Sequence, residues 1–143
     1  FALAGLRIGY AVSEKSLIKK LHASLPPWSV NTLASVAAVE TLKDGTYKTK
    51  IERWFAKEQP ALFSVLSEID ALTVYPSSAN YFTIKIKGGA GEAANLVKAL
   101  RKEGVLIRSL ADFTGLGSAC VRVSVRKSAE NRLLTDKLKQ YFR

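Results

Sequence analysis

Two short stretches of the chain alternate apolar and polar residues strictly. Apolar side chains occupy every second position in residues 82–87 (Phe, Ile, Ile) and again in residues 121–126 (Val, Val, Val). This period of two is typical of β-strands that bury one face. Helical patterns occupy residues 91–103, between these stretches, and residues 128–142, after the second. The sequence therefore predicts an α+β fold in which a sheet packs against helices.

The remaining elements are predicted from apolar spacing and from chain breakers. The apolar residues 1–12 predict a buried strand that has no partner within the chain. A helix capped by Ser13 should end before Pro26, and an alanine-rich helix should end near Leu42. A long helix follows, which Pro60 should kink or split. Strands are expected at residues 72–75, 80–87, 105–108 and 120–125.

Composition limits the classes of function. The chain has 143 residues, and its hydrophobic fraction of 48% is enough for one folded core. The net charge of +10 comes from Lys and Arg spread over most predicted helices, which indicates solvated helix faces more than a nucleic-acid surface. His22, the only histidine, is expected at the surface, and Cys120, the only cysteine, is expected to be buried and inert. A histidine-based triad, a metal site and an internal disulfide are therefore not predicted.

The apolar runs and the first residue bear on location and completeness. No apolar run approaches bilayer length, and the N-terminus lacks the regions of a signal peptide, which favours a soluble cytoplasmic chain without a membrane partner. The chain begins at Phe1 and contains no methionine. We expect a piece of a longer protein.

Three arginines stand in apolar surroundings. Arg108 closes one strand pattern and Arg122 lies within another, so the two can meet at one edge of a sheet. A guanidinium group suits a carboxylate or phosphate, and it is costly to bury unpaired. Arg122 therefore has either an internal acidic partner, which composition favours slightly, or an anionic ligand. Arg7, between Leu6 and Ile8, poses the same alternatives, while the scattered carboxylates form no self-sufficient catalytic set.

The first ten residues, Phe-Ala-Leu-Ala-Gly-Leu-Arg-Ile-Gly-Tyr, resemble the segment that follows the cofactor lysine in class I and II aminotransferases of fold type I. The resemblance covers essentially the whole chain. It implies pyridoxal 5'-phosphate as the cofactor and a cofactor lysine two positions before Phe1, so the fragment alone should be inactive. It also implies that Arg7 binds the cofactor phosphate and that Arg122 binds the substrate α-carboxylate.

The same resemblance implies a domain organisation. Residues 1–30 would end the large cofactor-binding domain and form the connection, and residues 31–143 would form the small C-terminal domain with an interdomain helix. The small domain would have an antiparallel sheet packed with helices. The parent enzyme would be a homodimer.

Three motifs narrow the resemblance. Residues 27–31 (Pro-Trp-Ser-Val-Asn), 78–82 (Ser-Ala-Asn-Tyr-Phe) and 104–108 (Gly-Val-Leu-Ile-Arg) are similar to those of threonine-phosphate decarboxylases of cobalamin biosynthesis, close relatives of histidinol-phosphate aminotransferases. The decarboxylases rank first, because the aminotransferases seldom keep the tryptophan and more often have glycine and threonine at residues 125–127. Ser109-Leu110 departs from the Asp-Cys pair common in the decarboxylases, which leaves the exact substrate open.

An amino-acid phosphate is the substrate that the resemblance implies. Arg108 and Arg122 are expected to hold its carboxylate and its phosphate, in an order that the sequence leaves open. Asn31 and Asn80 are weaker candidates for substrate binding. Asn80 fits equally well as a turn residue that opens its strand.

Two other classes of function stay open. A basic α+β module that binds RNA would explain the charge of +10, although its strands carry no aromatic ribonucleoprotein signature. A non-catalytic interaction domain would keep the fold, and its full-length gene would lack the cofactor lysine.

Overall fold

The structure, a computed structural model, describes residues 1 and 3–143, which form two compact units, residues 1–50 and 51–143. The first unit contains a short 3-10 turn η1 (Ala4–Leu6), helix α1 (Lys15–Ala23), helix α2 (Thr32–Lys43) and the start of α3 (Gly45–Ser67). The second unit contains the rest of α3, a four-stranded sheet and helices α4 (Gly89–Lys102) and α5 (Ser128–Tyr141). The predicted division at residue 30 concerns the domains of the parent enzyme and stays a prediction.

The strand predicted at residues 1–12 is wrong for residues 1 and 3–12, which the structure describes. Ala2 lies outside the described residues. Residues 4–6 form η1, and residues 7–12 have no regular secondary structure. A strand needs a neighbour for its N–H and C=O groups, and no described segment of this chain pairs with these residues. The predicted burial is wrong as well, because nearly all described residues of this segment are exposed, Tyr10 and Val12 each at 87%.

The helix starts and ends depend on local side chains. α1 begins after Glu14, whose side chain makes no capping hydrogen bond, so the predicted cap at Ser13 is wrong. α2 begins after Asn31 and ends at Lys43, close to the prediction. The Asp44 Oδ1 atom accepts a hydrogen bond from the Tyr47 backbone N–H at 2.8 Å, which caps α3. α3 then continues through Pro60 and is not split there.

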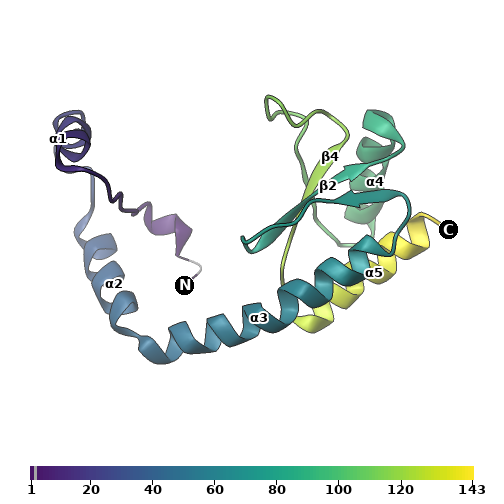
Figure 1. Ribbon diagram of the computed structural model, residues 1–143, viewed down its shortest axis with the longest axis horizontal. Helices are drawn as coiled ribbons and strands as arrows, with labels where there is room; N and C mark the ends of the chain where they lie inside the picture. The colour runs from purple at the N-terminus through teal and green to yellow at the C-terminus, as the bar shows by residue number, and fades with distance from the viewer. Residues whose placement is uncertain (2) are drawn as a thin grey trace. The chain divides into compact units, whose positions relative to one another are not determined.

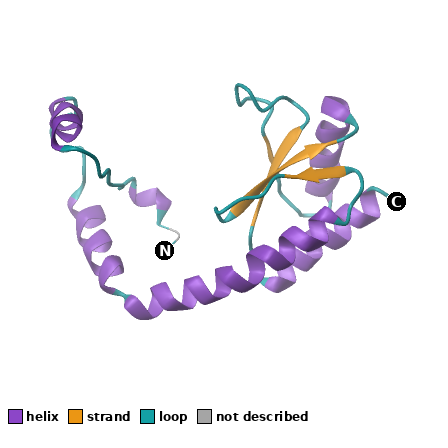
Figure 2. Cartoon of the chain, in the orientation of Figure 1, coloured by secondary structure: helices purple, strands orange, loops and turns teal. Residues whose placement is uncertain are grey.

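The sheet of the second unit is antiparallel throughout, in the order β1-β2-β4-β3. Its strands are β1 (Leu72–Val74), β2 (Tyr81–Ile86), β3 (Arg108–Ser109) and β4 (Cys120–Ser124). Figures 1 and 2 show β2 beside β4, and α5 alongside the second half of α3. The predicted α+β architecture is confirmed.

β3 differs from its predicted position, which was residues 105–108. The backbone N–H of Val105 donates to the Leu100 carbonyl at 2.9 Å, so this residue completes the end of α4 instead of joining the sheet. Pairing with β4 begins only at Arg108. The strand is therefore shorter and lies later in the chain than its apolar pattern indicates.

One face of the sheet carries the core. Phe82, Ile84, Val121 and Val123 are almost fully buried on this face. Helices α3, α4 and α5 cover it with leucines at positions 62, 66, 96, 100, 134 and 138. Cys120 is buried, as predicted. Five residues that alternate with them are exposed or half-buried and lie on the opposite, more open face: Tyr81, Thr83, Lys85, Arg122 and Ser124.

None of the helices in the described part of the chain is long and apolar enough to cross a membrane.

Candidate functional site

Arg108 and Arg122 are direct cross-strand partners. In the register of β3 and β4, the Cα atoms of these two residues face each other, and Thr83 of β2 is opposite Arg122 on the other side. This arrangement confirms that the two arginines meet at one edge of the sheet. Like charges directly opposite each other in a sheet are destabilising, so the pair needs compensation.

The two arginines are compensated differently. The Arg108 Nη2 atom donates to the Asp112 Oδ2 atom at 2.5 Å, and its guanidinium lies 5.9 Å from the centroid of the Phe113 ring. Arg122 is half-buried and stacks over the Tyr81 ring, with 5.0 Å between Cζ and the ring centroid. Within residues 1 and 3–143, no carboxylate forms an ion pair with Arg122. The internal acidic partner that composition slightly favoured for Arg122 is therefore absent among the described residues, whereas Arg108 has one, Asp112.

A hollow of about 450 Å³ lies next to this pair. Its lining comes from the segment before β3, the end of β4 and the first half of α5. Three arginines line the hollow, namely Arg108, Arg122 and Arg126. Arg126 is not among the site residues predicted from the sequence. Two sequence signals pointed to it: it lies in the polar phase of the period-two pattern that contains Arg122, and Glu130 follows four positions later on a predicted helix.

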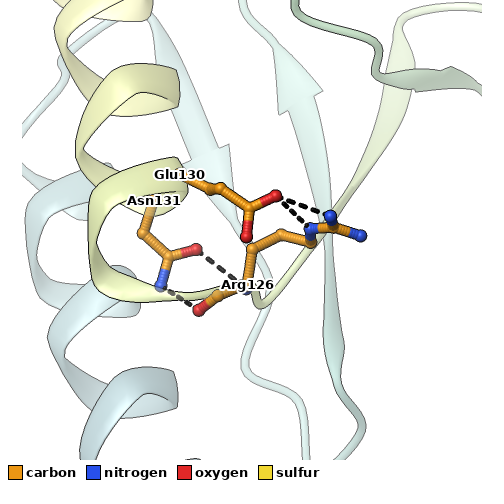
Figure 3. A network of polar contacts seen from close by, with 3 residues as sticks. All are labelled: Arg126, Glu130 and Asn131. Carbon is orange, nitrogen blue, oxygen red and sulfur yellow. Dashed lines mark hydrogen bonds and ion pairs between the residues drawn. The ribbon is translucent and has the colours of Figure 1, made fainter. Parts of the chain in front are cut away.

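Arg126 is held by an acid and by an amide, as Figure 3 shows. Its Nε and Nη2 atoms donate to the same oxygen of Glu130, Oε1, at 3.0 and 2.5 Å. This hydrogen bond and the charge of Arg126 lower the pKa of the Glu130 carboxyl group below its usual value, so Glu130 is ionised at neutral pH. The hollow therefore has a fixed ion pair at its rim.

The backbone of Arg126 is clamped by Asn131. Asn131 accepts from the Arg126 N–H through Oδ1 at 2.8 Å and donates to the Arg126 carbonyl through Nδ2 at 2.7 Å. The same Nδ2 atom donates to Glu58 Oε2 at 3.1 Å, and Ser128 Oγ donates to Glu58 Oε1 at 2.5 Å. Glu58 and Asn131 are buried, with 6% and 7% of their surfaces exposed. Helix α3 thus fixes the turn that joins β4 to α5.

The structure places Asn80 at the junction of two strands and Trp28 at the surface. The Asn80 carbonyl accepts from the Val125 N–H at 2.8 Å, which joins the start of β2 to the end of β4. Asn80 does not line the hollow. Trp28 has a positive φ of 61° and is 97% exposed, so it packs on no part of α2.

Asn31 is the N-cap of α2. Its Oδ1 atom accepts from the Ala34 N–H at 2.8 Å. We expect Asn31→Ala to lower the free energy of unfolding by about 1 kcal/mol and Asn31→Ser to change it little, since serine also caps. Chemical denaturation of the 143-residue chain measures both. Equal stability of the alanine and serine variants would contradict the capping role.

Arg7 lies at the surface of the first unit. It ends η1 in the left-handed region, with φ 54° and ψ 40°, and it is exposed. Its Nη1 atom donates to the Ala4 carbonyl at 3.4 Å, and no carboxylate in the described residues pairs with it. The contact of Arg7 with a cofactor phosphate stays a prediction.

Comparison with known proteins decides the family. The profile of the family described as "Aminotransferase class I and II" matches residues 1–138. This chain belongs to that family. The resemblance found in the sequence is thereby confirmed, and with it pyridoxal 5'-phosphate as the cofactor at the level of the family.

Individual relatives have two different names. A histidinol-phosphate aminotransferase from Methanothermobacter thermautotrophicus is 35% identical, over 91% of this chain and 35% of its own length. A threonine-phosphate decarboxylase from Salmonella typhimurium is 34% identical, over 94% of this chain and 36% of its own length. The chain thus spans about a third of the length of these curated relatives.

Solved structures show the same pair of names. The histidinol-phosphate aminotransferase from Clostridium acetobutylicum superimposes with a TM-score of 0.86 at 28% identity, over 99% of this chain and 42% of its own. The L-threonine-O-3-phosphate decarboxylase from Porphyromonas gingivalis gives a TM-score of 0.81 at 30% identity, over 99% and 43%. The fold is therefore that of the pyridoxal-phosphate-dependent aminotransferases.

Proposed function

We propose that the full-length protein containing this chain is a pyridoxal-phosphate enzyme that acts on an amino-acid phosphate, namely a threonine-phosphate decarboxylase of cobalamin biosynthesis. The observation that supports this most is the half-buried Arg122, which has no acidic partner among the described residues and lies opposite a second arginine. An arginine in this setting is stabilised by an anionic ligand. A substrate with two anionic groups matches two adjacent arginines.

The number of anionic groups favours the decarboxylase. Threonine phosphate carries a carboxylate and a phosphate, whereas histidinol phosphate carries only the phosphate. In our proposal, Arg122 binds the carboxylate and Arg108 binds the phosphate, each through the planar fork of its guanidinium. The arginine that fixes the carboxylate also fixes the bond from Cα to that carboxylate, which is the bond that a decarboxylase breaks.

The cofactor supplies an electron sink for bond breaking at Cα when it is bound. The residues of this chain position the reactants. Arg7 would hold the cofactor phosphate, and Arg108 and Arg122 would hold the substrate. The tyrosine ring below Arg122 limits the orientations open to its guanidinium, so less conformational freedom is lost on binding.

The alternative is a histidinol-phosphate aminotransferase or another aminotransferase. The TM-score of 0.86 with the Clostridium enzyme and the number of relatives with that name favour it. In that case Arg122 would bind the carboxylate of the second substrate, the amino acid or 2-oxo acid with which the amino group is exchanged. A non-catalytic basic domain is the third candidate, and salt-dependent RNA binding by the full-length protein would support it.

A product assay separates the candidates. The full-length protein, supplied with pyridoxal phosphate, is offered threonine phosphate alone and, separately, histidinol phosphate together with a 2-oxo acid as the amino acceptor. We expect carbon dioxide and aminopropanol phosphate from the first. If the enzyme transfers the amino group of histidinol phosphate and releases no carbon dioxide from threonine phosphate, the aminotransferase replaces this proposal.

The 143-residue chain alone serves as a further test. We propose that it has no activity, because the family's cofactor lysine is expected ahead of Phe1. We also propose a cytoplasmic homodimer for the full-length protein. Turnover by the isolated chain would contradict the first of these statements, and a monomer in analytical ultracentrifugation would contradict the second.

A further inference from the structure

A third cation borders the hollow and has no role in the reaction as proposed so far. Arg126 follows β4 directly, lines the hollow with Arg108 and Arg122, and keeps 63% of its side-chain surface exposed. Nε and Nη2 donate to Glu130, while no described residue accepts a hydrogen bond from Nη1. Part of this guanidinium is therefore free to bind an anion from solvent.

The base of Arg126 is rigid although its side chain is accessible. Asn131 binds both the N–H and the C=O of Arg126 (Figure 3). Asn131 is also buried and donates a hydrogen bond to Glu58 of α3. A functional side chain gains from such support, because less freedom is lost when the ligand binds. The exposed Glu130 pair then keeps the guanidinium at the rim of the hollow in the absence of ligand.

The charges around the hollow are not balanced. Arg108 is paired with Asp112 and Arg126 is paired with Glu130, while no acidic residue in the described part of the chain pairs with Arg122. A phosphate ester carries close to two negative charges at neutral pH. Such a dianion competes with Glu130 for Arg126, because arginine binds phosphate through the same planar fork that binds a carboxylate.

We propose that Arg126 is a specificity-determining residue that binds the substrate phosphate together with Arg108, exchanging its contact with Glu130 for the phosphate oxygens. This inference rests on the proposed function, since it takes an amino-acid phosphate as the substrate. Arg122 remains the carboxylate residue. Glu130 acts as a competing anion that rejects ligands too weakly charged to displace it.

Two variants with opposite expected effects test the proposal in the full-length enzyme loaded with pyridoxal phosphate. Inorganic phosphate is the probe, measured as a competitive inhibitor and by the rise in Tm that it causes. Arg126→Gln should weaken phosphate binding about 10- to 100-fold, because a charge-assisted contact is lost. Glu130→Gln should strengthen phosphate binding about two- to fivefold, because the competing charge is gone.

The opposite signs exclude a purely structural role. Both substitutions break the same ion pair, so a pair that only stabilised the turn would shift both variants in the same direction. Arg101→Gln is the matched control, since Arg101 is an exposed arginine on α4 that does not line the hollow. It reports how much a general loss of positive charge weakens phosphate binding.

The outcomes separate this inference from the proposed function. If the unchanged enzyme binds phosphate and turns over threonine phosphate, but both variants behave like Arg101→Gln, the role of Arg126 is refuted and the function stands. If the enzyme turns over a different substrate, the phosphate-induced rise in Tm still compares the variants. The same direction of change in Arg126→Gln and Glu130→Gln overturns the inference in either case.

Discussion

Replacing Arg122 by glutamine should lower kcat/KM of the full-length enzyme for its amino-acid phosphate by about 100-fold or more. Removal of one partner from a desolvated, hydrogen-bonded charge pair costs several kcal/mol, and each 1.4 kcal/mol is about a factor of ten. Arg122→Lys should recover only part of the loss, because an ammonium group lacks the planar fork. Steady-state kinetics with the product assay described above measure both variants.

The same substitution should hardly change stability, which makes this prediction specific. Within residues 1 and 3–143, Arg122 has no acidic partner to lose, and its removal relieves the repulsion from Arg108 on the neighbouring strand. The stacking on Tyr81 is lost at the same time, so the two effects offset each other within about 1 kcal/mol. A variant that unfolds at much lower denaturant while keeping its KM would show that Arg122 is a structural residue.

The arginine pair was predictable from sequence because it depends on strands. The period of two in residues 121–126 predicts β4, and the apolar residues before Arg108 predict a neighbouring extended segment. A residue within a strand has a defined face and register, so the meeting of Arg108 with Arg122 follows once both strands pair. The shift of β3 by a few residues did not affect this result.

The third arginine was not predictable in the same way. The period of two in residues 121–126 puts Arg126 in the same polar phase as Arg122, but β4 already ends at Ser124. The position of Arg126 in the following turn depends on the amide of Asn131 and on the buried Glu58, which is 73 residues from Asn131 in the chain. No periodicity connects side chains so far apart. The residue spacing of an amphipathic helix also does not show that a particular carboxylate, here Glu58, is buried and not on the exposed face.

The failed strand at residues 1–12 has a different cause. Its composition is that of a strand buried on both faces, but a strand forms only when its backbone groups find partners. Composition describes the environment that a segment requires, and pairing decides its conformation. Pro60 illustrates the reverse situation, because the packing of Leu62 and Leu66 keeps α3 helical where the local rule predicts a break.

Replacing Asn131 by leucine should lower the free energy of unfolding by about 3 kcal/mol. Leucine branches at the same carbon and is somewhat larger, so the change removes the hydrogen bonds without leaving a cavity. The N–H and C=O of Arg126 lose their partners, and the buried Glu58 carboxylate keeps only Ser128. Each buried polar group left without a partner costs about 1–3 kcal/mol, and charged groups cost more.

Three measurements separate this network from general damage to α5. Gln140→Leu on the same helix, at an exposed position, should change the free energy of unfolding by less than about 0.5 kcal/mol in urea titrations followed by circular dichroism. Adding Glu58→Leu to Asn131→Leu should cost less than the sum of the single variants, because the second change removes the carboxylate that the first leaves unpaired. Hydrogen exchange should speed up first at the Arg126 amide, whose acceptor is gone. Strict additivity of the two substitutions would mean that Glu58 does not depend on Asn131. It would contradict the inference that α3 fixes the turn that carries Arg126.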